Sequence, residues 1–118
     1  MRPLWIKMGM AIALLATAAA VPASGATLYW ASTAVHTNSI RTCFSFANTS
    51  MHALNFQNIR QSASEVAGSA PGAYAAVTCI GTSPRVTAVV MVAGENGNLV
   101  AQARDNLRNK IAGIVQID

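Results

Sequence analysis

Acidic residues, histidines and cysteines are all scarce in this sequence, which argues against most enzyme chemistry. The 118 residues include only 4 Asp and Glu, 2 His and 2 Cys. General acid–base catalysis needs such groups close together in one site, and structural zinc sites need four Cys or His ligands. The patterns Cys-x-x-Cys, His-x-x-x-His and Gly-x-Ser-x-Gly do not occur. The sequence therefore favours a protein without catalysis, bound cofactor or metal site.

Charged residues are also few. They make up 10% of the chain, and the net charge is +4. Two of the basic residues, Arg2 and Lys7, lie near the start, so the net charge after residue 26 is only +2. So small an excess does not provide the row of phosphate contacts on which nucleic-acid binding depends. We therefore expect no nucleic-acid partner.

The first 26 residues have the organisation of a secretory signal peptide. Arg2 and Lys7 precede an apolar run over residues 10–21, which is too short to span a bilayer comfortably. Ser24-Gly25-Ala26 supplies small residues for a signal peptidase, so we expect cleavage after Ala26, with Gly25 or Ala20 as alternatives. An uncleaved N-terminal anchor is the competing interpretation. Cleavage predicts a periplasmic or secreted protein with no stable membrane anchor.

Cys43 and Cys79 are the two cysteines. Export places them in an oxidising compartment, where a cysteine pair usually forms a disulfide. Closing the loop between them would stabilise the fold by about 3–4 kcal/mol in the chain-entropy model.

Two apolar runs, Tyr74–Ile80 and Val86–Ala93, predict an antiparallel hairpin. The residues between them, 81–85, contain Gly and Pro and favour a turn, and Pro84 must lie outside the strands because it cannot donate to a ladder. Residues 88–93 are apolar without alternation, which is typical of a central strand buried on both faces.

The remaining elements follow from local patterns. Residues 27–40 predict an N-terminal arm or a weak edge strand, and the alternation of Thr42, Phe44 and Phe46 predicts a strand over 41–47. Asn48 is expected to begin a helix that ends at Gly68 or Pro71.

The turn at residues 95–98 precedes a second predicted helix, which ends near Gly113. Its apolar stripe consists of Val100, Ala103, Leu107 and Ile111. Residues 114–117 then predict a short final strand.

The resulting order is β-α-β-β-α-β, the ferredoxin-like arrangement, in which two helices cover one face of an antiparallel sheet. Residues 41–118 would form this single α+β domain. In its usual strand order, one strand separates those that carry Cys43 and Cys79, and two strand spacings of about 9.6 Å are too long for a disulfide. The pair therefore needs Cys79 at a curled strand end or a different strand order, or both thiols stay free.

The face of the sheet away from the helices needs a cover, because soluble monomers rarely expose a large apolar surface. Either the arm with Tyr29 and Trp30 folds back, or a second copy packs face to face. We favour the homodimer; the third possibility is a mildly apolar face that stays bare.

Four basic residues are candidates for an anion site: Arg85, Arg104, Arg108 and Lys110. Arg104 and Arg108 are one helical turn apart, but Asp105 lies between them and no aromatic residue accompanies them. A solvated helix face is the simpler interpretation of this pattern.

Three segments, Thr42–Ala47, Ala75–Cys79 and Pro84–Val92, resemble parts of a family of small exported proteins from Gram-negative bacteria. The resemblance spans roughly residues 42–118. The family has no assigned function, so the resemblance implies export and a similar fold but no catalytic residue.

The sequence therefore predicts an exported binding or interaction module that associates with itself or with a protein partner. Two alternatives remain. The first is a small-ligand or soft-metal binder, which would use the sheet face or ligands such as the two cysteines, His36 and His52. The second is a small enzyme.

Overall fold

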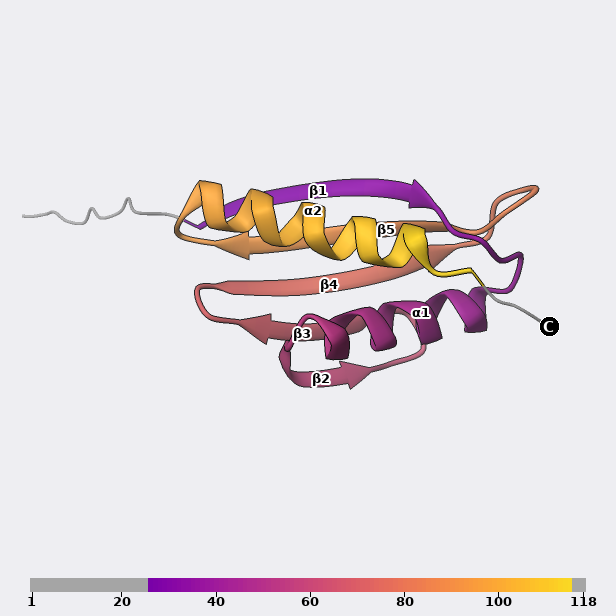
Figure 1. Ribbon diagram of the computed structural model, residues 1–118, viewed down its shortest axis with the longest axis horizontal. Helices are drawn as coiled ribbons and strands as arrows, with labels where there is room; N and C mark the ends of the chain where they lie inside the picture. The colour runs from indigo at the N-terminus through magenta and orange to yellow at the C-terminus, as the bar shows by residue number, and fades with distance from the viewer. Residues whose placement is uncertain (1–25, 116–118) are drawn as a thin grey trace, which may run out of the picture.

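The computed structural model describes residues 26–115, which form a five-stranded sheet and two helices (Figure 1). In chain order the elements are β1 (Thr27–Ala34), α1 (Ile40–Ala53), β2 (Gln57–Gln61), β3 (Val66–Ala70), β4 (Ala73–Ile80), β5 (Thr87–Gly94) and α2 (Gly97–Gly113). The predicted signal peptide lies outside the described residues except for Ala26.

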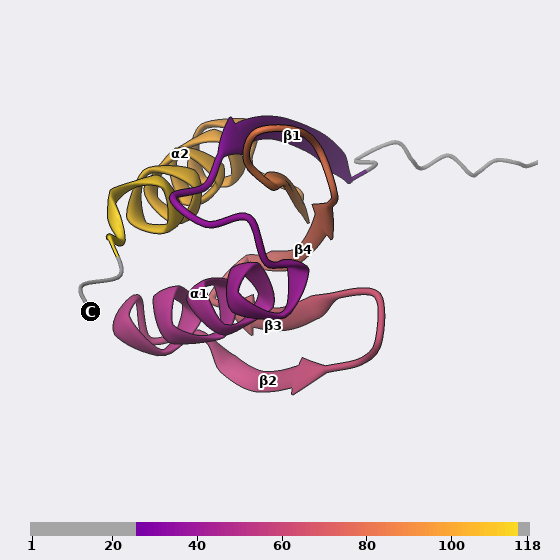
Figure 2. The same ribbon diagram turned by 90° about the vertical axis from the view of Figure 1, so that its right-hand side faces the viewer.

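The strand order is β1-β5-β4-β3-β2, and each neighbouring pair is antiparallel. Both helices lie on the same side of this sheet, as the end view in Figure 2 shows. The predicted α+β class with an antiparallel sheet is confirmed. The ferredoxin-like order is wrong, because the described chain runs β-α-β-β-β-β-α.

The central hairpin is confirmed. β4 and β5 pair in a register that joins Tyr74 to Ala93 and Ile80 to Thr87. Pro84 lies in the connecting loop, as expected. Burial alternates along β5: Val90 is fully buried beneath the helices, while its neighbour Met91 is half-buried on the other face.

Residues 41–47 belong to α1, so the strand predicted there is wrong. The alternation of aromatic residues holds over only a few positions, whereas burial along the whole helix has the helical spacing. The buried residues of α1 are Cys43, Phe44, Phe46, Ala47, Ser50 and Met51. Ser39 begins the helix, because its hydroxyl accepts a hydrogen bond from the Thr42 backbone N–H at 3.2 Å.

α1 ends at Ala53, well before the predicted end at Gly68 or Pro71. Asn55 has a φ of 63°, the left-handed conformation that often follows a helix. The next N–H, of Phe56, donates to the Met51 carbonyl at 2.9 Å. Asn marks a helix end less often than Gly does, which is why the sequence pattern predicts a longer helix.

The β2–β3 hairpin occupies the rest of that predicted helix. The Ser62 hydroxyl accepts hydrogen bonds from the N–H groups of Ser64 and Glu65, both at 3.2 Å, and forms the turn. Serine side chains that bond nearby backbone groups compete with helix formation. Ala63, in the middle of the predicted helix, is exposed in this turn.

The second helix, α2, is confirmed. The Asn96 side chain accepts a hydrogen bond from the Leu99 N–H at 3.0 Å and caps its first turn. The predicted stripe faces the sheet: Val100, Leu107 and Ile111 are fully buried. The final strand does not form over residues 114–115, where Val115 makes one isolated bridge to His36; the rest of that segment is not described.

β1 confirms the edge-strand interpretation of the N-terminal segment. It pairs with β5 along its whole length, from Thr27 opposite Gly94 to Ala34 opposite Thr87. The alternative in which Tyr29 and Trp30 fold back across the sheet is therefore wrong. The core lies between the sheet and the two helices, and both sides contribute to it.

Candidate interaction face

The sheet face opposite the helices, here called the open face, has no covering element among the described residues. Paired residues of neighbouring strands share a face, so the strand registers assign its side chains. They are Leu28, Trp30, Ser32, Ala34, Gln57, Arg60, Ala67, Ser69, Tyr74, Ala76, Thr78, Ile80, Thr87, Val89, Met91 and Ala93. Most of these are apolar or small, and one is charged.

The largest apolar side chains of the open face are strongly exposed. Trp30 is 64% exposed, Leu28 60% and Tyr74 74%. Single exposed apolar residues are common on soluble proteins, but three on one face mark a surface that gains from being covered. The predicted burial of β5 on both faces is not met within one chain, because only its helix side is buried, while Val89, Met91 and Ala93 on the open face are half-buried.

A hollow of about 420 Å³ lies on the open face. Small residues form its floor, among them Ala67, Ser69 and Ala76. Leu28 and Tyr74 stand at its rim, and Arg60 is the one charged residue among those that line it. The hollow therefore crosses the sheet from β1 to β2, and both large and small side chains line it.

A hydrogen bond connects the β2–β3 turn to Thr78, a residue of the open face on β4. The Thr78 hydroxyl donates a hydrogen bond to the Ser64 carbonyl at 2.7 Å. This contact joins the turn to the middle strand β4, which stiffens the sheet on the side away from the hollow.

Both edge strands are poorly suited to pair with another chain. On β1, the backbone carbonyl of Ser32 accepts a hydrogen bond from Nε of Arg108 on α2 at 3.1 Å. On β2, the pairing is short and its register shifts between Gln57 and Arg60, where Asn58 has a φ of 54°. Side chains and bulges of this kind protect sheet edges from adding strands.

The predicted disulfide between Cys43 and Cys79 is present, with a Cα–Cα distance of 6.2 Å. It joins α1 to β4. The geometric objection raised by a ferredoxin-like order does not apply, because Cys43 lies on a helix above β4 and not on a strand two places away. The two cysteines are therefore not free to act as thiolate ligands.

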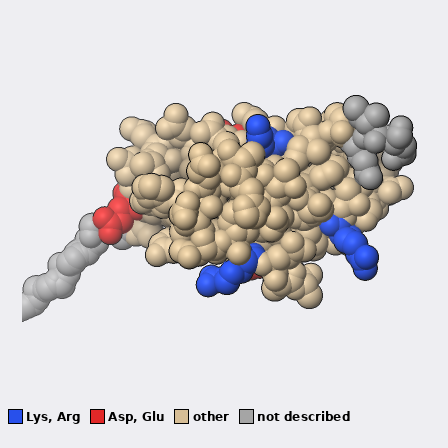
Figure 3. Space-filling model, turned by 60° about the horizontal axis from the view of Figure 1, so that its bottom comes forward, with Lys and Arg blue, Asp and Glu red and all other residues tan. Residues whose placement is uncertain are grey.

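The four basic residues predicted as an anion site do not form one cluster. Arg104, Arg108 and Lys110 lie on α2, while Arg85 is in the β4–β5 loop. The Arg104 guanidinium pairs with Asp105 at 2.9 Å and lies 5.5 Å from the centre of the Tyr29 ring. On the side drawn in Figure 3, basic side chains are scattered rather than gathered in a patch. Anion binding stays a prediction.

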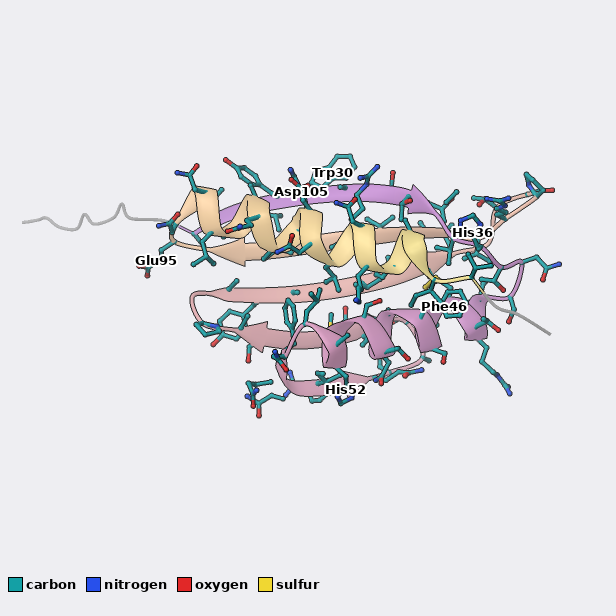
Figure 4. All side chains as sticks on the ribbon, in the orientation of Figure 1. Trp30, His36, Phe46, His52, Glu95 and Asp105 are labelled. Atoms are coloured by element: carbon teal, nitrogen blue, oxygen red, sulfur yellow. A yellow bond between two sulfur atoms is a disulfide. The ribbon has the colours of Figure 1, made fainter. Side chains whose placement is uncertain are left out.

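The two histidines come from different parts of the molecule. His36 lies between β1 and α1 at one end, and His52 lies in the last turn of α1 (Figure 4). Within residues 26–115, no three His, Cys, Asp or Glu side chains come together in a way that would hold a metal ion. No helix in this range is long and apolar enough to cross a membrane.

The chain matches no protein family, no curated protein and no solved structure. The resemblance of three segments to small exported proteins therefore stays a prediction.

Sequence reasoning did not group Trp30 and Leu28 with Arg60 and the small residues of β3. The apolar patch around Trp30 was visible in the sequence, and so was the need to cover a sheet face. Their proximity depends on strand registers that bring together residues from both halves of the chain, and no local pattern contains that information.

Proposed function

We propose that this protein is an exported, non-catalytic interaction module that self-associates through its open face. The observation that carries this proposal is the combination of Trp30, Leu28 and Tyr74 exposed on a sheet face with almost no charge. The disulfide is consistent with an oxidising compartment outside the cytoplasm.

The area of the open face supports a dimer. Strands rise about 3.3 Å per residue and lie about 4.8 Å apart, so a five-stranded sheet with strands of this length offers roughly 500 Å². Two copies would bury about 1,000 Å² in total, the lower limit for a specific interface. We therefore expect a dimer that dissociates on dilution.

A second copy fits this face better than a charged partner does. Edge-to-edge pairing is hindered by Arg108 of α2, which donates to the Ser32 carbonyl of β1, and by the irregular β2. The face carries one charged residue, Arg60, near its β2 edge, so it offers no charge pattern for an acidic or basic protein to complement. Face-to-face packing of two sheets is also a common way to build a core.

Light scattering over a range of concentrations tests this proposal. The chain after residue 26 should be dimeric at high concentration and monomeric when diluted. Trp30→Ser removes a large exposed anchor and should weaken association at least about 30-fold, as expected for an interface tryptophan worth about 2 kcal/mol or more.

Val115→Ser serves as the matched control. Val115 is 60% exposed, close to the value for Trp30, but it follows α2 and is not part of the open face. This variant should associate as the unchanged protein does. A chain that stays monomeric at every concentration tested, or equal weakening by both variants, would contradict the proposal.

A further inference from the structure

We propose a specific arrangement for this dimer: a two-fold axis parallel to the strands, which places Trp30 of one copy over Arg60 of the other. This inference rests on the proposed self-association and adds the orientation of the partner. It follows from the order of side chains across the sheet.

One row of the open face runs from the β1 edge to the β2 edge. The registers place Trp30 beside Met91, Met91 beside Ala76, Ala76 beside Ala67, and Ala67 beside Arg60. The β1 half of this row is bulky, and its middle, on β4 and β3, consists of two alanines. The row therefore has large apolar side chains on β1 and β5, small ones on β4 and β3, and one long charged side chain on β2.

Two identical sheets form a closed face-to-face dimer about a two-fold axis that lies in the plane between them. An axis parallel to the strands and centred on β4 places β1 of one copy over β2 of the other, and β5 over β3. Met91 of one copy then meets Ala67 of its partner, so a large side chain packs on a small one. Ala76 meets its own counterpart at the axis.

The same axis places the Trp30 ring over the Arg60 guanidinium of the partner copy. An arginine over a tryptophan face is a favourable cation–π contact, and it strengthens when water is excluded. The two Arg60 side chains of the dimer lie at opposite edges of the interface, so they do not repel each other.

An axis across the strands, centred on the same row, has the opposite consequences. Trp30 would meet Trp30, Arg60 would meet Arg60, and the alanines of β4 and β3 would meet alanines, which leaves space between the two sheets. Like charges in contact and unfilled volume both oppose association. The order of side-chain size and charge along this row therefore favours the axis parallel to the strands.

Cysteine cross-linking tests this orientation. The neighbouring row of the open face has Leu28 at the β1 edge and Gln57 at the β2 edge. Within one copy these positions are separated by four strand spacings, about 19 Å. The strand-parallel axis brings Leu28 of one copy over Gln57 of the partner.

We expect the double variant Leu28→Cys/Gln57→Cys to form covalent dimers with a short bismaleimide, at a concentration where light scattering shows it to be dimeric. Each single variant is the matched control and should cross-link at least about tenfold less. Mass spectrometry after digestion verifies that Cys43 and Cys79 remain bonded to each other.

The outcomes separate the two proposals. Cross-linking of the double variant well above both single variants supports the orientation. A dimer by light scattering whose double variant cross-links no better than the single variants overturns the orientation and leaves self-association standing. A protein that is monomeric throughout overturns self-association, and the orientation with it.

Discussion

At the scale of single residues, Gly94 shows how closely the chain is packed at the end of β5. A Cβ atom at this position would overlap the carbonyl oxygen of Gly72, in the β3–β4 turn, and would approach Val100 Cγ2 of α2 to 2.8 Å. Neither the turn nor the helix can retreat easily, because each is packed on the sheet. Because Gly94 has no side chain, the end of β5, the β3–β4 turn and α2 can lie in contact at this point.

Gly94→Ala should therefore destabilise the protein by about 1–3 kcal/mol, the usual cost of inserting volume into a packed site. The urea midpoint of unfolding, followed by circular dichroism, measures this change.

Gly113→Ala is the control for the glycine substitution itself. Gly113 is the last residue of α2, and a Cβ there meets no atom within 4 Å. This variant should be neutral or stabilised by up to about 1 kcal/mol, since alanine favours a helix. Equal destabilisation by both substitutions would show that the close approach at Gly94 is not the cause.

At the scale of elements, α1 depends on its connection to the sheet. Its buried residues pack against β4, β3 and β2, and the disulfide from Cys43 to Cys79 attaches it to the centre of the sheet. A chain with so small a core gains a large fraction of its stability from one cross-link.

The double variant Cys43→Ala/Cys79→Ala should lose about 3–4 kcal/mol of unfolding free energy, because the unfolded chain is no longer constrained by a loop between these positions. Equilibrium urea unfolding measures this loss. Adding a reductant to the unchanged protein should produce a similar shift, and adding it to the double variant should produce none. If a reductant does not change the stability of the unchanged protein, the assigned disulfide between Cys43 and Cys79 is contradicted.

At the scale of the whole molecule, stability and association use opposite faces of one sheet. Val90 faces the helices and is fully buried, while the adjacent Met91 faces the open side. Charged residues are nearly absent from the open face, so any association through it must depend on apolar contact rather than on ion pairs.

The dimer should therefore be insensitive to salt. Raising sodium chloride from about 0.05 M to 1 M should change the dissociation constant by less than about threefold, because the one charged residue of each open face, Arg60, meets a neutral Trp30 and forms no ion pair that salt would screen. Sodium sulfate should tighten association, since it favours burial of apolar surface. Light scattering in a salt series measures both effects, and dissociation by sodium chloride would instead indicate a charged interface.

The sequence by itself determined the elements whose patterns are long or sharply bounded. The hairpin of β4 and β5 follows from two apolar runs around a Gly/Pro turn, and α2 from a stripe of apolar residues after the turn at residues 95–98. The predicted export to an oxidising compartment likewise favoured a disulfide between Cys43 and Cys79. In each case the cause lies within one short segment or in one property of the chain.

Only the tertiary structure decided the rest. Residues 41–47 alternate as a strand does, yet packing of Cys43, Ala47 and Met51 against the sheet makes them helical. The row from Trp30 to Arg60 exists because four separate strand registers align distant residues. Local patterns record the preference of a segment, whereas the shape of the open face depends on which segments become neighbours, and that is settled by burial across the whole fold.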